Sequence, residues 1–411
     1  MRTVGIICEY NPFHTGHKRQ IDILRSMGYD CVICAMSGNY TQRGELAIFD
    51  KYTRAESALH GGADLIVELP FPFSSLSAEG FANAGVHILS SLGVDAISFG
   101  SECADVTLLE CAAEAILSPE FATAYNDLQR SGLGSAAAYF EAIKKLSGTD
   151  TALLSNDILA ISYIAAIKRQ KVNIKIVPIK REGAAYSDKS LCEGSLPSAS
   201  AIREALKNNA SDPEKLLGYI PKDSLSVLSR AKNDGLSPVF AENIEKEILS
   251  FFKIMTSAEI ITRAISRSKG GAHIAEDGCG IIERICRVAR ESKSYSEFLM
   301  NSYNCKYTDA RINRVILFSL LGVSDKWAHS LPEYTVLLGA NGTGRAYLSE
   351  IRKSCDFNIV TKPADAEDGS VQKLISEAAD AIYTSALPQK TSHDYFIKAH
   401  PIMLKGQNLK K

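Results

Sequence analysis

The sequence predicts an α/β protein: a Rossmann-like parallel-sheet domain, then a mainly helical part and a small C-terminal α/β segment. Three observations support this. In the first half, short apolar runs alternate with amphipathic segments, which is the pattern of strand–helix–strand units with right-handed crossovers. From about residue 215 the apolar residues recur at helical spacing without a clear strand. Strand-like runs return from about residue 334.

The elements of the first half follow from local patterns. Each expected strand is a short apolar run, and each expected helix repeats apolar residues every three or four positions. Glycines follow several of these helices, as is common at helix C-termini. In chain order we expect strands at 4–8, 31–36, 64–68, 96–99 and 174–178, and helices at 18–27, 50–59 and 78–92.

The later elements are mainly helical. The pattern predicts helices near 241–254, 256–267, 277–291 and 307–321, and strands at 334–338 and 357–360. Between these strands we expect a glycine-rich turn, Gly342-Thr-Gly-Arg345, rather than a second phosphate site. A chain of 411 residues has room for two or three domains. We expect the regions to be 1–212, 213–330 and 331–411.

Composition excludes several classes of protein. Hydrophobic residues make up 45% of the chain and charged residues 23%, which is ordinary for a globular protein and not for a disordered or fibrous one. No apolar run approaches the roughly 18 residues that cross a bilayer. The first apolar stretch is too short for a signal peptide, because polar Glu9 and Asn11 follow at once. We therefore expect a cytoplasmic protein without a membrane partner.

The ten cysteines are expected to be free thiols, because the cytoplasm is reducing. Only Cys31 and Cys34 are close together in the chain, and both lie in an apolar run. No second pair with zinc-ligand spacing is present. We interpret these two as buried thiols of a strand rather than as a metal or redox site.

Charge is unevenly distributed, although the formal net charge is only −1. Residues 1–150 carry 10 Lys and Arg against 18 Asp and Glu, whereas residues 151–411 carry 36 against 29. A basic later part allows an anionic polymer to bind there. Chance surface charge is the alternative.

The stretch Glu9-Tyr-Asn-Pro-Phe-His-Thr-Gly-His17 carries the clearest chemical signal. It joins the first strand to the first helix, and ligands of open parallel sheets bind outside the carboxyl ends of strands. A helix N-terminus attracts phosphate, and Gly16 allows a close approach of the backbone. His14 and His17 share a helix face and can both donate to phosphate oxygens during a transfer reaction. A capped turn with two surface histidines, or a zinc pair, is the alternative.

His14-Thr-Gly-His17 after a strand resembles the T/HxGH motif of the nucleotidyltransferase superfamily, which shares its fold with class I aminoacyl-tRNA synthetases. The segment from Pro197 to Arg203 is similar to that superfamily's second signature, Ile-Ser-Ser-Thr-x-x-Arg, with Pro197 for Ile and Ala199 for the second Ser. The resemblance implies possible phosphate contacts from Ser198, Ser200 and Arg203. A plain helix N-cap is the alternative.

Several blocks together narrow the resemblance to the bacterial tRNA(Met) cytidine acetate ligase family. They follow the family's order: Ile6 to His17, Met36 to Glu45, Ser98 to Glu102, Leu154 to Ala160 and Ile179 to Gly183. That family activates acetate with ATP to give acetyl-adenylate and pyrophosphate. It then acetylates the exocyclic amine of the wobble cytidine of elongator tRNA(Met), without coenzyme A. The resemblance therefore implies a ligase that forms N(4)-acetylcytidine, AMP and pyrophosphate in an N-terminal nucleotidyltransferase-like domain.

The resemblance also implies a set of ATP contacts, with His14 and His17 as the catalytic pair. The further contacts are Ile7, Cys8, Glu9, Tyr10, Asn11, Pro12, Phe13, Thr15, Gly16, Lys18, Arg19, Gln20, Gly100, Asn156 and Arg181. From its chemistry, the Asn156 amide suits ribose or adenine edges, and Arg181 suits phosphate. A helix N-cap and a solvated loop arginine are the respective alternatives.

Acetate is a small carboxylate and needs a cation near the α-phosphate. Arg43, in the loop after the second strand, is the candidate from its position and charge, and a purely structural loop is the alternative. Magnesium is expected to accompany ATP, because it neutralises the leaving pyrophosphate. No sequence motif requires a dedicated metal site in the protein.

Residues 284–314 are the candidate tRNA-binding surface. Three arginines recur every three positions, and interleaved tyrosines such as Tyr295, Tyr303 and Tyr307 can stack on unpaired bases. A basic stripe positions RNA through its phosphates without reading the sequence. The candidate contacts are Arg284, Arg287, Arg290, Lys293, Lys306, Arg311 and Arg314. A solvated helix face over core tyrosines is the alternative, and residues 168–232 form a second basic stretch.

Two other functions fit parts of the sequence. One is a small-molecule adenylyltransferase of cofactor synthesis, and the other is a non-catalytic RNA-binding protein. The roughly 200 residues beyond the nucleotide fold argue against the first, because its chemistry needs little more than one such domain. The intact His14-Thr-Gly-His17 argues against the second. The sequence carries no signal for an oligomeric state.

Overall fold

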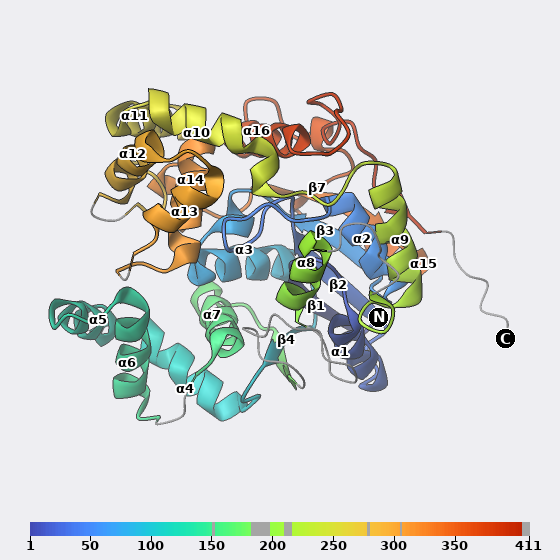
Figure 1. Ribbon diagram of the computed structural model, residues 1–411. Helices are drawn as coiled ribbons and strands as arrows, with labels where there is room; N and C mark the ends of the chain where they lie inside the picture. Colours follow the sequence, from blue (N-terminus) through green and yellow to red (C-terminus); the bar gives the residue numbers. More distant parts are fainter. Residues whose placement is uncertain (150–152, 182–197, 209–215, 278–279, 305, 405–411) are drawn as a thin grey trace.

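A computed structural model describes residues 1–149, 153–181, 198–208, 216–277, 280–304 and 306–404 (Figure 1). Its centre is a sheet in the order β5-β4-β1-β2-β3-β6-β7, with β8 paired to β6. β1 to β5 are parallel, which confirms the α/β prediction for the first half. The strands are β1 (Thr3–Cys8), β2 (Cys31–Ser37), β3 (Leu65–Leu69), β4 (Ala96–Ser101), β5 (Lys175–Lys180), β6 (Tyr334–Ala340), β7 (Asn358–Val360) and β8 (Ile402–Met403).

The helices of the first half connect and cover these strands. α3 packs against β1, β2 and β3, and α7 packs on α3 and β4. These helices are α1 (Thr15–Ser26), α2 (Lys51–His60), α3 (Ala78–Ser91), α4 (Val106–Leu117), α5 (Glu120–Arg130), α6 (Ser135–Ser147), α7 (Ser155–Gln170) and α8 (Ala199–Asn208). Cys31 and Cys34 are fully buried in β2, as expected of strand thiols.

The four helices expected in the later part are confirmed, and further helices lie before, between and after them. Together they are α9 (Lys222–Asn233), α10 (Glu245–Ile254), α11 (Ser257–Ser268), α12 (Ile281–Glu291), α13 (Tyr295–Ser302), α14 (Asp309–Leu321), α15 (Gly342–Ile351) and α16 (Val371–Ser385). The glycines near 342 do not form a separate turn. They are the first turn of α15, where Asn341 Oδ1 accepts the Gly344 N–H at 3.0 Å.

The C-terminal strands extend the first sheet instead of forming one of their own. β6 pairs antiparallel with β3, and β7 and β8 pair with β6. The carboxylate of Asp380 on α16 accepts hydrogen bonds from Asn39 Nδ2 at 2.9 Å and from Lys51 Nζ at 2.7 Å. Residues on the two sides of the expected boundary near 331 therefore share one sheet. Strand pairing and buried ion pairs join residues 331–404 to the N-terminal core.

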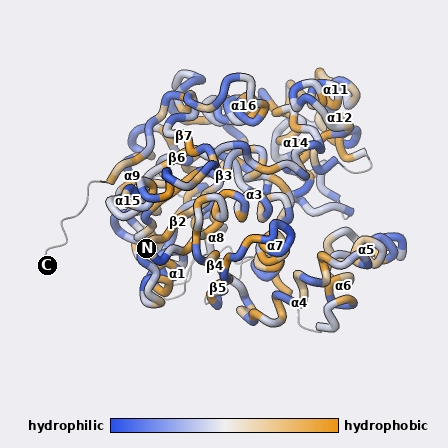
Figure 2. Tube along the Cα trace, turned by 180° about the vertical axis from the view of Figure 1, so that it is seen from behind, coloured by the Kyte–Doolittle hydropathy of each residue, from blue (hydrophilic) through white to orange (hydrophobic). Residues whose placement is uncertain are grey.

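Figure 2 shows that hydrophobic segments concentrate on the central strands and their covering helices, whereas α5 and α6 stand away from the sheet. α5 has no buried residue. Among the described residues, no helix is both long and apolar enough to cross a membrane.

The order in which successive strands are added to the sheet reverses at β1. β2 and β3 follow on one side of β1, whereas β4 and β5 lie on the other side. The carboxyl ends of β1 and β4 therefore border the switch point of the sheet, which is where doubly wound α/β proteins bind ligands. α1 begins at this point, directly after the loop of residues 9–14.

Candidate active site

A buried arginine on α2 fixes the loop that follows β1. Arg54 on α2 is fully buried and donates to the carbonyl oxygens of Glu9 (2.5 Å), Ser37 (3.0 Å) and Phe49 (2.8 Å). Asn11 Oδ1 accepts the Ile48 N–H at 2.9 Å. Burial lowers the pKa of Arg54. The guanidinium thus replaces lost hydration with carbonyl groups and ties the loop after β1 to the loop after β2.

The two histidines of the motif are fixed by backbone groups at the start of α1. His14 is the N-cap, and its Nδ1 accepts the Gly16 N–H at 3.1 Å. His17 Nδ1 accepts the His14 N–H at 3.3 Å, and the two rings stack with centroids 3.6 Å apart. Since each Nδ1 accepts a hydrogen bond, a neutral imidazole carries its proton on Nε2.

Both imidazoles are held neutral near pH 7. Burial, together with the charges of Arg181 and Arg203, lowers the pKa of His14 to about 3. Burial, with His14 and Arg181 beside it, also lowers the pKa of His17 well below its usual value. The pair therefore offers Nε2–H donors while the guanidinium groups supply the positive charge, an arrangement suited to a polyphosphate.

The second motif places Arg203 beside the first. Arg203 Nη1 donates to the Asn11 carbonyl at 3.1 Å, and Nη2 donates to Ser200 Oγ at 3.1 Å. Ser198 Oγ accepts the Ala201 N–H at 3.0 Å, so this serine caps α8, as the alternative interpretation has it. Pro197 lies outside the described residues.

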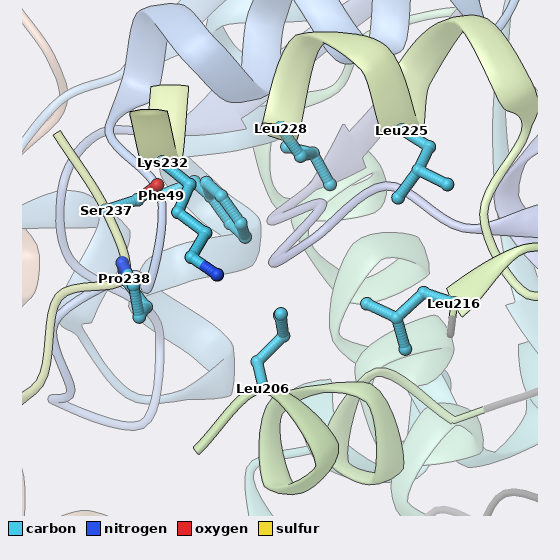
Figure 3. A pocket seen from close by; sticks show the side chains of 8 residues that line it. All are labelled: Phe49, Leu206, Leu216, Leu225, Leu228, Lys232, Ser237 and Pro238. Atoms are coloured by element: carbon cyan, nitrogen blue, oxygen red, sulfur yellow. The ribbon is translucent and has the colours of Figure 1, made fainter. Parts of the chain in front are cut away.

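The far end of α8 rests on a small apolar cluster that is separate from the main core. Figure 3 shows the side chains of Leu206, Leu216, Leu225 and Leu228 pointing into a shared cavity beside Phe49. α9 in turn packs on α2, the helix that carries Arg54. The position of Arg203 therefore depends on this cluster as well as on its own hydrogen bonds.

The ends of β4 and β5 form the other wall of the site. The Arg181 N–H donates to the Ser101 carbonyl at 2.9 Å, and a Cβ at Gly100 would lie 3.2 Å from Arg181 Cγ. Asn156 Nδ2 donates to Glu102 Oε1, which ties α7 to the loop after β4. Asn156 is not the N-cap of α7, because Leu154 holds that position.

The remaining residues of the 7–20 stretch divide into two groups. Ile7, Cys8, Tyr10, Pro12 and Phe13 are buried and shape the loop from within. The others lie along α1. The Thr15 N–H donates to the Tyr219 carbonyl at 2.9 Å, Lys18 pairs with Asp22 at 2.7 Å, Gln20 Nε2 donates to Ser98 Oγ at 3.1 Å, and Arg19 is exposed.

The loop after β2 closes the third side. The Gln42 N–H donates to Glu9 Oε1 at 2.8 Å, and Arg43 is half-buried. Gln42, Arg54 and Glu45 were missed by sequence reasoning. α2 also carries Lys51, Glu56 and His60, so no local signal singled out Arg54. Among the described residues, no group of three or more His, Cys, Asp or Glu side chains is arranged to hold a metal ion.

The comparisons with known proteins cover nearly the whole chain. The family model described as HIGH Nucleotidyl Transferase matches residues 1–396. A tRNA(Met) cytidine acetate ligase of Acetivibrio thermocellus is 35% identical over 89% of this chain and 89% of its own length. One of Clostridium perfringens is 33% identical over 97% of this chain and 98% of its own.

The chain belongs to the tRNA(Met) cytidine acetate ligase family. This confirms the resemblance drawn from the sequence blocks. Two solved structures of TmcAL from Thermotoga maritima have the same fold. The apo form has a TM-score of 0.88 at 31% identity, over 99% of this chain and 100% of that one. The form bound with α-thio ATP has a TM-score of 0.85 at 30% identity, over the same shares.

For this ligase family member, the structure divides the basic stretch 284–314 into exposed and internal cations. Arg287, Arg290, Lys293 and Lys306 are exposed. Arg314 is buried and paired with Glu276 at 3.0 Å, so it faces the interior and corrects the expectation of an RNA contact.

Two other arginines of the stretch also serve the protein itself. Arg284 donates to the carbonyls of Asn301 (2.7 Å), Ser302 (3.1 Å) and Tyr303 (3.2 Å), so it does not share a free face with the exposed arginines. Arg311 donates to the Glu276 carbonyl at 3.0 Å and lies over the Tyr307 ring.

Proposed function

We propose that the chain catalyses ATP-dependent ligation of acetate to the wobble cytidine of elongator tRNA(Met), through an acetyl-adenylate, giving N(4)-acetylcytidine, AMP and pyrophosphate. The observation that carries the proposal is a stacked pair of neutral histidines at the start of α1 in a chain whose full-length relatives bear the ligase name. The reaction consumes no coenzyme A and takes place in the cytoplasm.

The first step joins acetate to the α-phosphate. ATP would lie at the N-terminus of α1, with its nucleoside toward Gly100, Asn156 and Arg181 and its phosphates toward the histidines and Arg203. An acetate oxygen attacks the α-phosphorus, and pyrophosphate leaves with the electron pair of the broken bond. The Nε2–H groups of His14 and His17 donate to the oxygens on which negative charge develops. Arg43 is the proposed cation for acetate.

Magnesium is proposed to arrive with ATP, because it neutralises the charge of the leaving pyrophosphate.

The second step needs the tRNA. Exposed cations on and near α12 and α13 are the proposed phosphate contacts: Arg287, Arg290, Lys293 and Lys306. Such contacts hold the RNA without reading its sequence, so the choice of base falls to the active site.

One assay tests the proposal against its alternatives. The protein is incubated with ATP, radiolabelled acetate and bulk tRNA, without coenzyme A, and the RNA is digested to nucleosides. Labelled N(4)-acetylcytidine is the expected product. Tight tRNA binding without ATP consumption would favour a non-catalytic RNA-binding protein. Adenylylation of a small phosphorylated partner without labelled RNA would favour a cofactor-forming adenylyltransferase.

A further inference from the structure

The loop of residues 38–47 is a tight hairpin that presents one exposed carboxylate. The Glu45 carbonyl accepts the Thr41 N–H at 2.9 Å and Thr41 Oγ1 at 3.3 Å. Gly44 has a φ of +74°, and a Cβ there would lie 2.5 Å from the Arg314 backbone nitrogen on α14. The backbone around Glu45 is therefore held in place, while its side chain is open to solvent.

This hairpin connects the active-site loop to the helical part. On one side, the Gln42 N–H donates to Glu9 Oε1 at 2.8 Å. On the other side, the Gln42 carbonyl accepts from Arg314 Nη1 at 3.3 Å, and Arg314 is paired with Glu276. The hairpin thus lies between the nucleotide site and α14, and α12 with its exposed arginines packs on α14.

The Glu45 carboxylate interacts electrostatically with charged or titratable groups on both sides of the hairpin. Arg203, Arg43 and Glu9 of the candidate active site interact with it electrostatically. Tyr295 and Tyr303, from α13 and its end, do so from the helical part. Partial burial raises the pKa of Glu45, the charges of Arg203 and Arg43 lower it, the charge of Glu9 raises it, and the net shift is upward.

The transfer step needs a proton acceptor, and the histidines cannot serve. Their Nδ1 atoms accept backbone N–H groups, and their pKa values lie far below neutrality. Tyr295 and Tyr303 cannot serve either, because burial raises the pKa of both phenols. Of the carboxylates that the contacts above place around the hairpin, Glu9 already accepts the Gln42 N–H and Glu276 is paired with Arg314, which leaves Glu45.

We propose that Glu45 is the general base of acetyl transfer, a role that rests on the function proposed above. Cytidine N4 attacks the acetyl carbonyl carbon and forms the new C–N bond. The C–O bond to the α-phosphate breaks, and AMP leaves with its electron pair. The proton that N4 loses passes to the Glu45 carboxylate, which later releases it to water. A positioned base of this kind contributes typically about 10²–10⁴ in rate.

The test separates the two half-reactions in Glu45→Gln. Acetate-dependent exchange of pyrophosphate into ATP reports the first step, and single-turnover transfer from preformed acetyl-adenylate to tRNA reports the second. We expect transfer to fall about 10²–10³-fold and exchange to fall far less. Wild-type transfer should rise with pH as a carboxyl group ionises, and Glu45→Gln should lack that limb. Glu45→Asp should keep the limb at a reduced rate.

Glu350→Gln, at an exposed carboxylate on α15, is the matched control and should behave as wild type in both steps. Thermal midpoints of all variants check folding. Wild-type transfer and an unchanged pH profile in Glu45→Gln would overturn the proposal, as would equal losses in both half-reactions. A wild-type protein that forms no acetylcytidine would instead overturn the proposed function itself.

Discussion

The loop before α1 and the surface of α12 use charge in opposite ways. At the loop, carbonyl oxygens surround the buried Arg54, and backbone N–H groups fix both histidines. On α12, Arg287 and Arg290 are exposed, and Arg290 Nη2 also donates to the Met255 carbonyl at 3.5 Å. Fixed groups in a water-poor site stabilise developing charge without reorganisation, whereas hydrated cations attract a polyanion at long range. The first region is therefore suited to chemistry and the second to affinity.

The largest expected effect comes from Arg314, which the sequence assigns to the basic surface but the structure places in the interior. Arg314→Met leaves Glu276 nearly buried without its partner, and we expect a loss of about 3–5 kcal/mol in the free energy of unfolding. Arg287→Met, at an exposed arginine, should change it by less than about 0.5 kcal/mol. Urea unfolding of both variants measures the two free energies of unfolding. Equal values would contradict the internal role of Arg314.

The next effect concerns the histidine pair. His17→Ala removes a donor that acts mainly on charge developing during transfer, so acetyl-adenylate formation should fall about 10²–10³-fold in kcat. ATP affinity should change much less. Pyrophosphate release and ATP binding, measured separately, give the two numbers. Near wild-type kcat would contradict a catalytic role for this residue.

A smaller effect is expected at the basic surface. Replacing Arg287, Arg290 and Lys293 with Glu should lower tRNA affinity about tenfold or more and flatten its salt dependence by about two to three counterions. Acetate-dependent pyrophosphate exchange without tRNA should stay at the wild-type level. Arg311 is left intact, because it supports the Glu276 carbonyl. A stable triple variant with wild-type affinity and salt slope would place the RNA elsewhere, such as along residues 168–232.

The smallest expected effect is a pH dependence of stability. The His14 imidazole binds a proton near pH 6.5 in the unfolded chain but only near pH 3 in the folded one. The unfolded state therefore binds more protons between these values, and stability falls as the pH drops below about 6.5. Between pH 7 and 5 this group should account for about 1–2 kcal/mol.

His14→Asn should remove the His14 part of that dependence and leave the part due to His17, since asparagine retains an N-cap. Unfolding free energies of the variant and the wild type, measured from pH 7 to 5, give the difference. Parallel curves would mean that His14 is not held neutral.

Local patterns were sufficient for the strands of the first half. β1 to β5 lie within about two residues of their expected positions, because short buried strands are read directly from apolar runs. Several helices were not expected, namely α4, α5, α6, α9, α13 and α16. For α13 the reason is its length, since eight residues give a weak helical pattern. The joining of β6 to β3 was also missed, because antiparallel pairing across some 270 residues leaves no trace in either strand's own sequence.

For the site, the sequence by itself determined the histidine motif, its place after a strand and the family, because residue types at short spacing carry that information. Only the tertiary structure decided which cations face outward. Arg287 and Arg314 are indistinguishable as letters, yet one is hydrated and the other is paired inside. It also brought Arg54 and Arg203 to the same loop from two distant segments. Burial and partners depend on packing between segments, and no local pattern encodes them.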